Sequence, residues 1–221
     1  MNRSVLLTNG NLSSVQRAAA WFAAAGDHVY IGQAENGEAL PEGVYSLPFD
    51  PMCNESLTAA VSLLEKREGK LDILILSAGT YMHDGEIGIG HDCNAMLDIL
   101  MQNLYGSFET TEAFLPLLRR GMKRIAAITD MESSNSYSAG KDDLAYSASK
   151  AALNMMGKIY FNKLRPEGFT FRWYCETDGT GGMSAGEYIA SALCYDEKEP
   201  YIHSDENRLV LRDGFLREIS W

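Results

Sequence analysis

The first half of the chain alternates short apolar runs with longer amphipathic segments. Residues 5–8, 28–32 and 72–77 form apolar runs of strand length, and the last is apolar at nearly every position, as in a strand buried on both faces. Between these runs, residues 15–22 and 57–64 carry apolar side chains at the spacing of an amphipathic helix. A strand, a helix and a second strand in this order imply a right-handed crossover and therefore a parallel sheet.

The second half of the chain continues this alternation. Helical periodicity predicts long helices at residues 94–121 and 144–164, and apolar runs predict strands at residues 123–129 and 169–175. Residues 208–219 have the pattern of a hairpin or a strand and turn. We therefore expect an α/β fold, a Rossmann-like doubly wound parallel sheet with helices on both faces.

The length of the chain bounds the number of domains, and its net charge limits the kinds of partner that it can bind. At 221 residues the chain has the length of one α/β domain, and we assign residues 1–221 to a single domain. Its 19 Lys and Arg against 30 Asp and Glu give a net charge of -11, which argues against a nucleic acid partner because phosphate binding needs a basic patch. No apolar run reaches the roughly 20 residues of a membrane span, so we expect no membrane partner.

The cysteines and histidines suggest neither a disulfide framework nor a metal site. The cysteines lie far apart without a C-x-x-C motif, which favours reduced thiols in a cytoplasmic protein; they are Cys53, Cys93, Cys175 and Cys194. The loop from residue 81 contains isolated potential ligands that lack the paired spacing of metal sites, so we expect no metal. These residues are His83, His91, Asp92 and Cys93.

The pair Tyr146 and Lys150 is the strongest candidate for chemistry. Side chains four residues apart share a helix face, so the phenol and the ammonium point into one site. A phenol with an ordinary pKa of about 10 is a poor acid-base catalyst at neutral pH. A nearby cation favours the phenolate, and we therefore expect Lys150 to lower the pKa of Tyr146.

Three segments, in the same order along the chain, resemble the short-chain dehydrogenase/reductase family. Residues 146–153 (YSASKAAL) resemble the active-site helix of the family, residues 71–79 (LDILILSAG) resemble its fourth strand, and residues 102–108 (QNLYGSF) resemble its next helix. The family resemblance implies an NAD(P)-dependent oxidoreductase that interconverts a carbonyl and an alcohol by hydride transfer. It also implies a small-molecule substrate and a homodimer or homotetramer in which the two long helices pair with their copies.

The resemblance also implies roles for individual residues. Tyr146 would carry the proton, Lys150 would bind the nicotinamide ribose, and Asn103 would hold a water of the proton relay. A serine hydroxyl normally polarises the substrate carbonyl. Counting back thirteen residues from Tyr146 places Ser133 in this role, with Ser134 beside it, whereas alignment from the strand end places Asp130 there. Both alignments remain open at this stage.

The first turn departs from the family pattern. In the family it reads T-G-x-x-x-G-x-G, whereas this chain keeps Thr8 and replaces the glycines with Asn9, Ser13 and Val15. The hydroxyl of Ser13 or Ser14 at the start of the helix could hold the cofactor phosphates. A helix that is simply capped by one of these serines is equally compatible with the sequence.

Other cofactor contacts follow from the resemblance. Asp50 lies where the family contacts the adenine amino group, although it also precedes a turn, and the backbone of Ala78 and Gly79 would approach the cofactor. The second strand ends at Gly32 and Gln33, neither of which is acidic or basic, so the choice between NAD and NADP stays open.

A second hypothesis is a cofactor-free member of the family that acts as a binding or subunit-partner protein. The replaced glycines, Asp130 and the short segment between residue 176 and an expected helix at residues 184–193 support it. The presence of Asn103, Tyr146 and Lys150 together favours the enzyme. A third interpretation is an enzyme that works without a nicotinamide cofactor and in which Tyr146 acts as an acid or a base.

Overall fold

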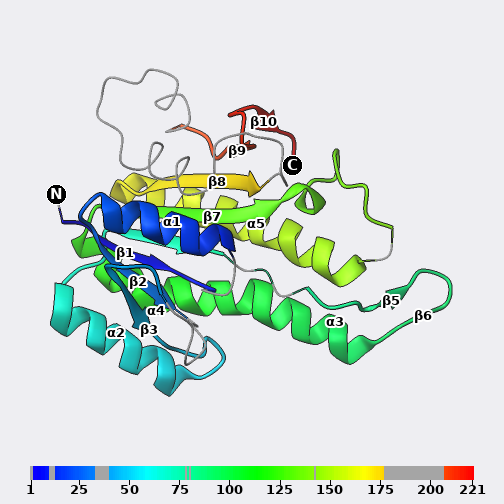
Figure 1. Ribbon diagram of the computed structural model, residues 1–221. Helices are drawn as coiled ribbons and strands as arrows, with labels where there is room; N and C mark the ends of the chain where they lie inside the picture. The colour runs from blue at the N-terminus through cyan, green and yellow to red at the C-terminus, as the bar shows by residue number, and fades with distance from the viewer. Residues whose placement is uncertain are drawn as a thin grey trace.

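The computed structural model describes residues 2–9, 13–32, 40–77, 79, 81–141, 143–176 and 207–221, with the side chain of Ser13 left out. Within these residues the main sheet has the order β10-β9-β8-β7-β4-β1-β2-β3 (Figure 1). Neighbouring strands are parallel except β9 and β10. The strands are β1 (Ser4–Leu7), β2 (His28–Gly32), β3 (Val44–Leu47), β4 (Ile73–Leu76), β7 (Arg124–Asp130), β8 (Thr170–Glu176), β9 (Leu211–Arg212) and β10 (Glu218–Ile219). This topology confirms the predicted doubly wound sheet.

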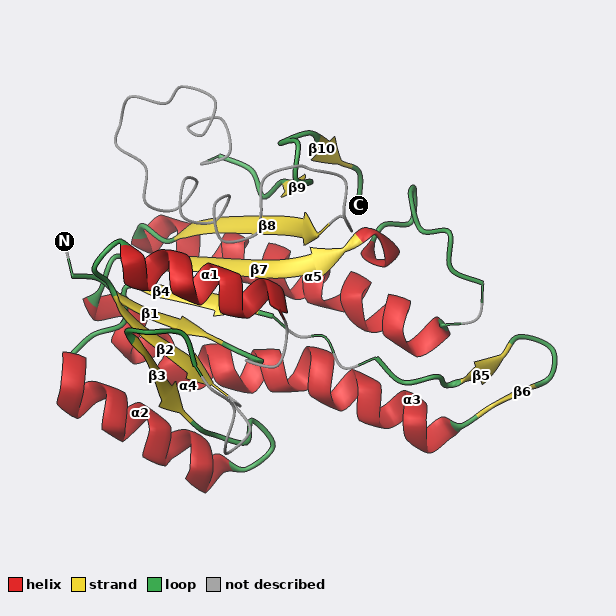
Figure 2. Ribbon diagram, viewed as in Figure 1, coloured by secondary structure: helices red, strands yellow, loops and turns green. Residues whose placement is uncertain are grey.

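Helices cover both faces of the sheet (Figure 2). They are α1 (Ser13–Ala24), α2 (Asn54–Glu68), α3 (Cys93–Leu100), α4 (Gly106–Arg120) and α5 (Leu144–Leu164). Helix α1 packs on one face, and α2, α4 and α5 pack on the other. Among the described residues, none of the helices has the length and hydropathy needed to cross a membrane.

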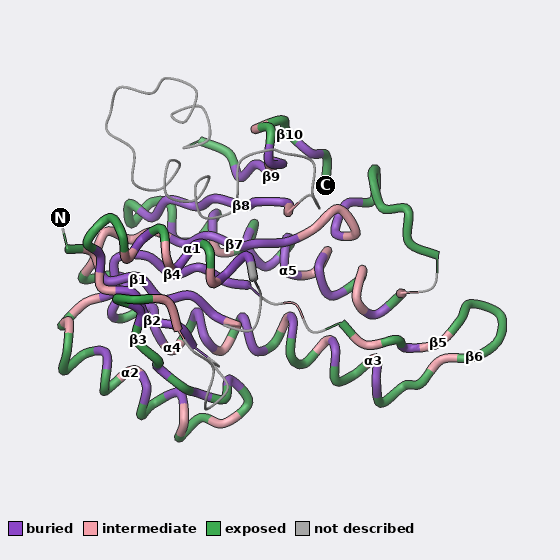
Figure 3. Tube along the Cα trace, viewed as in Figure 1, coloured by how far each residue is buried: buried purple, intermediate pink, exposed green. Residues whose placement is uncertain are grey.

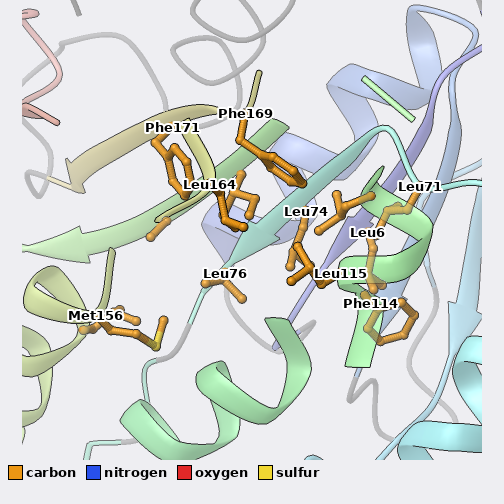
Figure 4. Packing of buried hydrophobic residues seen from close by; sticks show 14 of the residues in the cluster. Leu6, Leu71, Leu74, Leu76, Phe114, Leu115, Met156, Leu164, Phe169 and Phe171 are labelled. Carbon is orange, nitrogen blue, oxygen red and sulfur yellow. The ribbon is translucent and has the colours of Figure 1, made fainter. Parts of the chain in front are cut away.

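The strands are apolar at successive positions because each of their faces meets a helix layer. Val5 and Leu7 of β1 join the cluster that contains Phe22 of α1. Leu6, between them, belongs to the opposite cluster with Phe114 of α4 (Figure 4). Successive side chains of a strand point to opposite faces, so both clusters draw on the same strands. The central strands are accordingly buried along their length (Figure 3).

The predicted helix at residues 94–121 contains an irregular turn. Helix α3 passes into a π-helical turn, η1 (Met101–Tyr105), before α4 begins at Gly106. An i→i+5 turn inserts an extra residue into the helical repeat, and such turns are frequent at functional sites. Asn103 lies in this turn and is buried.

Three short strands were not predicted from the sequence, and two of them, β5 and β6, lie in the expected loop from residue 81. Strand β3 lies at the sheet edge, and its first and last residues are buried whereas its two middle residues are exposed, so it lacks the alternation typical of a strand. Strands β5 (Gly85–Glu86) and β6 (Gly90–His91) form a hairpin whose glycines 85, 88 and 90 have positive φ angles. The expected C-terminal hairpin is confirmed as β9 and β10, whereas the helix expected at residues 184–193 lies outside the described residues.

Helix α5 approaches β8 closely at one glycine. A β-carbon added to Gly157 would overlap the indole ring of Trp173, which is buried on the sheet. The absence of a side chain at this position therefore sets the distance between the helix that carries Tyr146 and the sheet.

Gly157→Ala should destabilise the fold by about 1–3 kcal/mol through overpacking, although alanine has the higher helix propensity. Chemical denaturation measures this change. Asn162→Ala, at an exposed position of the same helix, is the control and should be neutral or slightly stabilising. A Gly157→Ala variant as stable as the control would contradict the close contact.

Candidate active site

The first turn of α5 is held by a carboxylate from a distant segment. The buried Asp84 accepts a hydrogen bond from the backbone N–H of Ala145 at 2.8 Å, and its own carbonyl accepts one from Asp92 N–H at 2.8 Å. A carboxylate at a helix N-terminus satisfies a free N–H and interacts favourably with the helix dipole. The segment before β5 therefore positions Tyr146, a role for Asp84 that no sequence motif indicated.

Tyr146 meets the end of β7. Its hydroxyl donates a hydrogen bond to Asp130 Oδ2, and the other carboxylate oxygen, Oδ1, accepts from Glu132 N–H at 3.0 Å. The Tyr81 ring packs edge-on against the Tyr146 ring at a centroid distance of 5.4 Å. Of the two alignments, the one from the strand end therefore describes the contact at Tyr146, because Asp130 is the residue at its hydroxyl.

The two candidate serines bond to the backbone instead. Ser133, in the 3-10 turn η2 (Met131–Ser133), donates to the carbonyl of Asp130 at 2.6 Å. Ser134 donates to the carbonyl of Ser220, which ties this loop to the C-terminus. Both serines are buried. The hydroxyl of Ser133 is thus engaged by the end of β7, and its contact with a substrate carbonyl stays a prediction.

Lys150 lies under the Tyr146 ring. Its Nζ is 5.4 Å from the ring centroid, and the residue is buried. Burial lowers the pKa of Lys150 because it disfavours the ammonium form, and the nearby carboxylate of Asp130 partly opposes this shift. The sequence correctly predicted that the phenol and the amine face the same site.

The predicted direction of the Tyr146 pKa shift was wrong for the described site. Burial raises the pKa of Tyr146, and the negative charge and hydrogen bond of Asp130 raise it further, followed by the charges of Glu132 and Asp143. An acceptor carboxylate stabilises the phenol rather than the phenolate. Helical spacing places only Lys150 beside Tyr146, whereas tertiary contacts bring these carboxylates to the ring.

Asn103 is joined to the same helix turn. Its side-chain Nδ2 donates to Ser149 Oγ at 3.0 Å, and Ser149 Oγ donates to the carbonyl of Tyr146 at 2.7 Å. The π-helical turn η1 therefore places Asn103 against the helix that carries Tyr146 and Lys150. The structure brings these three predicted residues together from two elements.

Thr8, one of the predicted cofactor residues, lies near the point where strand order reverses. Thr8, after β1, accepts a hydrogen bond from Ser77 N–H at 2.8 Å, and Ser77 follows the adjacent β4. Ligands of doubly wound sheets bind beyond the carboxyl ends of strands at this switch point. Ser77 Oγ is buried there and has no hydrogen-bond partner among the described residues. A free hydroxyl at this position fits a polar ligand such as a dinucleotide.

The structure shows where some of the other predicted cofactor residues lie, but not whether they contact a cofactor. Ser14 is buried in the first turn of α1, Gly79 is half-buried, and Ala78 lies outside the described residues, as does the side chain of Ser13. Asp50 is exposed and accepts a hydrogen bond from Met52 N–H at 2.8 Å, as a turn residue does. Contacts of these residues with phosphate or adenine stay predictions.

Comparison with known proteins identifies the family. The family model described as short chain dehydrogenase matches residues 16–175, which is more than half of the chain. The chain belongs to the short-chain dehydrogenase/reductase family. Members of this family are generally NAD(P)-dependent oxidoreductases that act on small molecules and often form oligomers.

Individual relatives agree with the family assignment. The chain is 30% identical over 187 residues to the short-chain dehydrogenase AnuI of Penicillium roqueforti, covering 71% of each protein. It is 24% identical over 170 residues to the 3-oxoacyl-acyl-carrier-protein reductase MabA of Mycobacterium avium, covering 77% of this chain and 64% of MabA. The crystal structure of Sniffer from Caenorhabditis elegans, a candidate carbonyl reductase, shares the fold with a TM-score of 0.78 at 18% identity, covering 100% of both chains.

Asp130→Asn should lower the pKa of Tyr146, because the variant removes the negative charge that opposes phenolate formation. In the wild-type protein, Tyr146 should remain a protonated phenol when the pH rises above about 10, which is the ordinary pKa of a tyrosine side chain. Phenolate absorbance during an alkaline titration measures the change, and Tyr146→Phe identifies the contribution of this residue. Identical titration curves for the wild-type and Asp130→Asn proteins would show that the charge of Asp130 does not raise the pKa of Tyr146.

Proposed function

We propose that this protein is an NAD(P)-dependent oxidoreductase that interconverts a carbonyl and an alcohol, with Tyr146 as the proton donor or acceptor. The observation that carries the proposal is the buried Lys150 beneath the Tyr146 ring, joined through Ser149 to Asn103. Burial lowers the pKa of Lys150, and titratable groups whose pKa is shifted by burial are concentrated at functional sites. The names of AnuI and MabA, a dehydrogenase and a reductase, support the same class of chemistry.

The nicotinamide supplies or accepts the hydride when it is bound. Lys150 would hold its ribose, and the switch point at Thr8 and Ser77 would receive the dinucleotide together with Ser14. Tyr146 would hold the proton. Burial and Asp130 raise its pKa, so Tyr146 is a phenol at neutral pH, which is the form that donates a proton, but the raised pKa also makes it a weaker acid.

A cofactor-free binding protein is the second candidate function. The observation that favours it is the hydrogen bond from the Tyr146 hydroxyl to Asp130, which engages the group that would react with a substrate. In that case the site would be preserved by its internal contacts alone. Nucleotide binding distinguishes the two functions.

We also propose that the protein forms a homodimer or homotetramer through α4 and α5. Large apolar side chains are exposed along this face: Tyr105, Phe108, Met155 and Ile159. The Phe108 and Tyr160 rings are in contact at a centroid distance of 6.4 Å, so the exposed faces of the two helices are continuous. A cytoplasmic location belongs to the same proposal, supported by the free thiols of Cys53, Cys93 and Cys175.

Millimolar NADH or NADPH should raise the thermal midpoint of the wild-type protein by several degrees. A ligand at 100 times its Kd stabilises the native state by about 2.7 kcal/mol, and about 1 kcal/mol moves the midpoint of a chain of this length by about 2–4 °C. Thermal unfolding with each nucleotide measures the shift and identifies the preferred cofactor.

Lys150→Met keeps the length of the buried side chain and should abolish most of this shift, whereas Lys163→Met, an exposed change on the same helix, should preserve it. The absence of a shift with both nucleotides would favour the cofactor-free binding protein. A shift that survives Lys150→Met unchanged would remove Lys150 from the cofactor site.

Ile159→Glu should dissociate the proposed oligomer by at least one step, because it places a charge in an apolar interface. Sedimentation velocity measures the assembly state of the variant. Leu63→Glu, an exposed apolar position on α2, is the control and should leave assembly unchanged. A wild-type protein that sediments as a monomer would disprove the proposed interface.

A further inference from the structure

The carboxylate of Asp130 is held in the candidate site by hydrogen bonds to both of its oxygens. One oxygen accepts the Tyr146 hydroxyl, and the other accepts the backbone N–H of Glu132 at 3.0 Å. Both oxygens act as acceptors, as an ionised carboxylate does. A substrate oxygen that reaches the Tyr146 hydroxyl must therefore also come close to Asp130.

The surroundings of the Tyr146 hydroxyl are acidic. The charges of Asp130, Glu132 and Asp143 all act on the phenol. Glu176 lies opposite Asp130 in the register of β7 and β8, and both carboxylates act on Lys150. The Lys150 amine lies on the side of the ring face, whereas the hydroxyl end faces the carboxylate of Asp130. The site thus presents negative charge at the position where the substrate reacts.

This charge conflicts with an uncharged carbonyl substrate. Reduction moves negative charge onto the carbonyl oxygen, and an adjacent carboxylate opposes that change electrostatically. A hydroxyl donor would stabilise the oxygen, but the structure engages Ser133 with the backbone. A hydrogen-bond donor or a positive charge on the substrate would stabilise this oxygen and would also interact favourably with the Asp130 carboxylate.

A protonated amine on the carbon next to the reacting carbon meets both requirements. The oxygen and nitrogen of a vicinal amino alcohol can lie within hydrogen-bond distance of each other, and the Tyr146 hydroxyl and Asp130 are also separated by one hydrogen bond. The ammonium would pair with Asp130 while the oxygen meets Tyr146. Charge-assisted hydrogen bonds of this kind are about twice as strong as neutral ones.

We infer that the substrates of this site are amino ketones and the corresponding vicinal amino alcohols, bound through their ammonium group by Asp130. The inference rests on the proposed function. In the reduction, the carbonyl carbon takes a hydride from the reduced nicotinamide, the oxygen takes the proton of Tyr146, and solvent restores that proton. The nicotinamide loses two electrons, the carbonyl gains them, and the ammonium group is unchanged.

Binding of matched ligands to the nucleotide-loaded protein tests this inference. Isothermal titration calorimetry at neutral pH would compare phenylethanolamine with phenyl glycol, and isopropanolamine with propylene glycol, since each pair exchanges only the ammonium for a hydroxyl. The wild-type protein should bind each amino alcohol at least about tenfold more tightly than its diol. Asp130→Asn should remove most of that preference without abolishing nucleotide binding.

Asp98→Asn makes the same change at an exposed position of α3 and should keep the preference, so it controls for the overall charge of the protein. Equal or tighter binding of the diols by the wild-type protein, or a preference that survives Asp130→Asn, would overturn the inference while the nucleotide titration still supports the proposed function. Loss of nucleotide binding in the wild-type protein would instead reject the proposed function and this inference with it.

Discussion

The hydrogen bond between Tyr146 and Asp130 joins the carboxyl end of β7 to the first turn of α5, and the chemistry of the site depends on it. It places a negative charge at the hydroxyl that the family resemblance assigns to proton transfer. The same bond keeps Tyr146 in its phenol form, because burial and the carboxylate both raise the pKa of the phenol. A site of this kind holds the phenol in its protonated form, and it favours ligands that bring their own positive charge.

The surrounding structure holds this bond from several directions. Asp84 anchors the N-terminal turn of α5, Asn103 contacts the following turn through Ser149, and Gly157 sets the approach of the helix to the sheet. Each of these contacts comes from a different place along the chain. Because they act on one helix, small changes in any of them would move Tyr146 and Lys150 relative to β7.

The sheet explains why the site lies where it does. Parallel strands end at the same edge, so the residues after β1, β4, β7 and β8 meet there. A hydrogen bond between Thr8 and Ser77 connects the ends of β1 and β4. Asp130 and Glu176 are the last residues of β7 and β8 and lie opposite each other in the strand register. The edge therefore passes from the hydroxyl groups of Thr8 and Ser77 at the switch point to an acidic region at Tyr146.

Much of the architecture could be predicted from the sequence alone. Apolar runs and helical periodicity predicted the parallel sheet and its main helices, because a strand buried on both faces and a helix buried on one face require these patterns. The spacing of Tyr146 and Lys150 also predicted a shared helix face, since the helical repeat fixes it locally. Short edge strands such as β3 and the hairpin of β5 and β6 escaped prediction because so few residues carry little periodic signal.

Only the tertiary structure decided the electrostatics of the site. The sequence left Ser133 and Asp130 as alternatives for the position near the Tyr146 hydroxyl. The number of residues in a loop does not determine which of its side chains points toward the helix. The pKa of Tyr146 was predicted in the wrong direction for the same reason, since Lys150 is a neighbour in sequence whereas Asp130 is a neighbour only in space. Local spacing determines which residues share a helix face, but charge interactions sum over every group that the fold brings near.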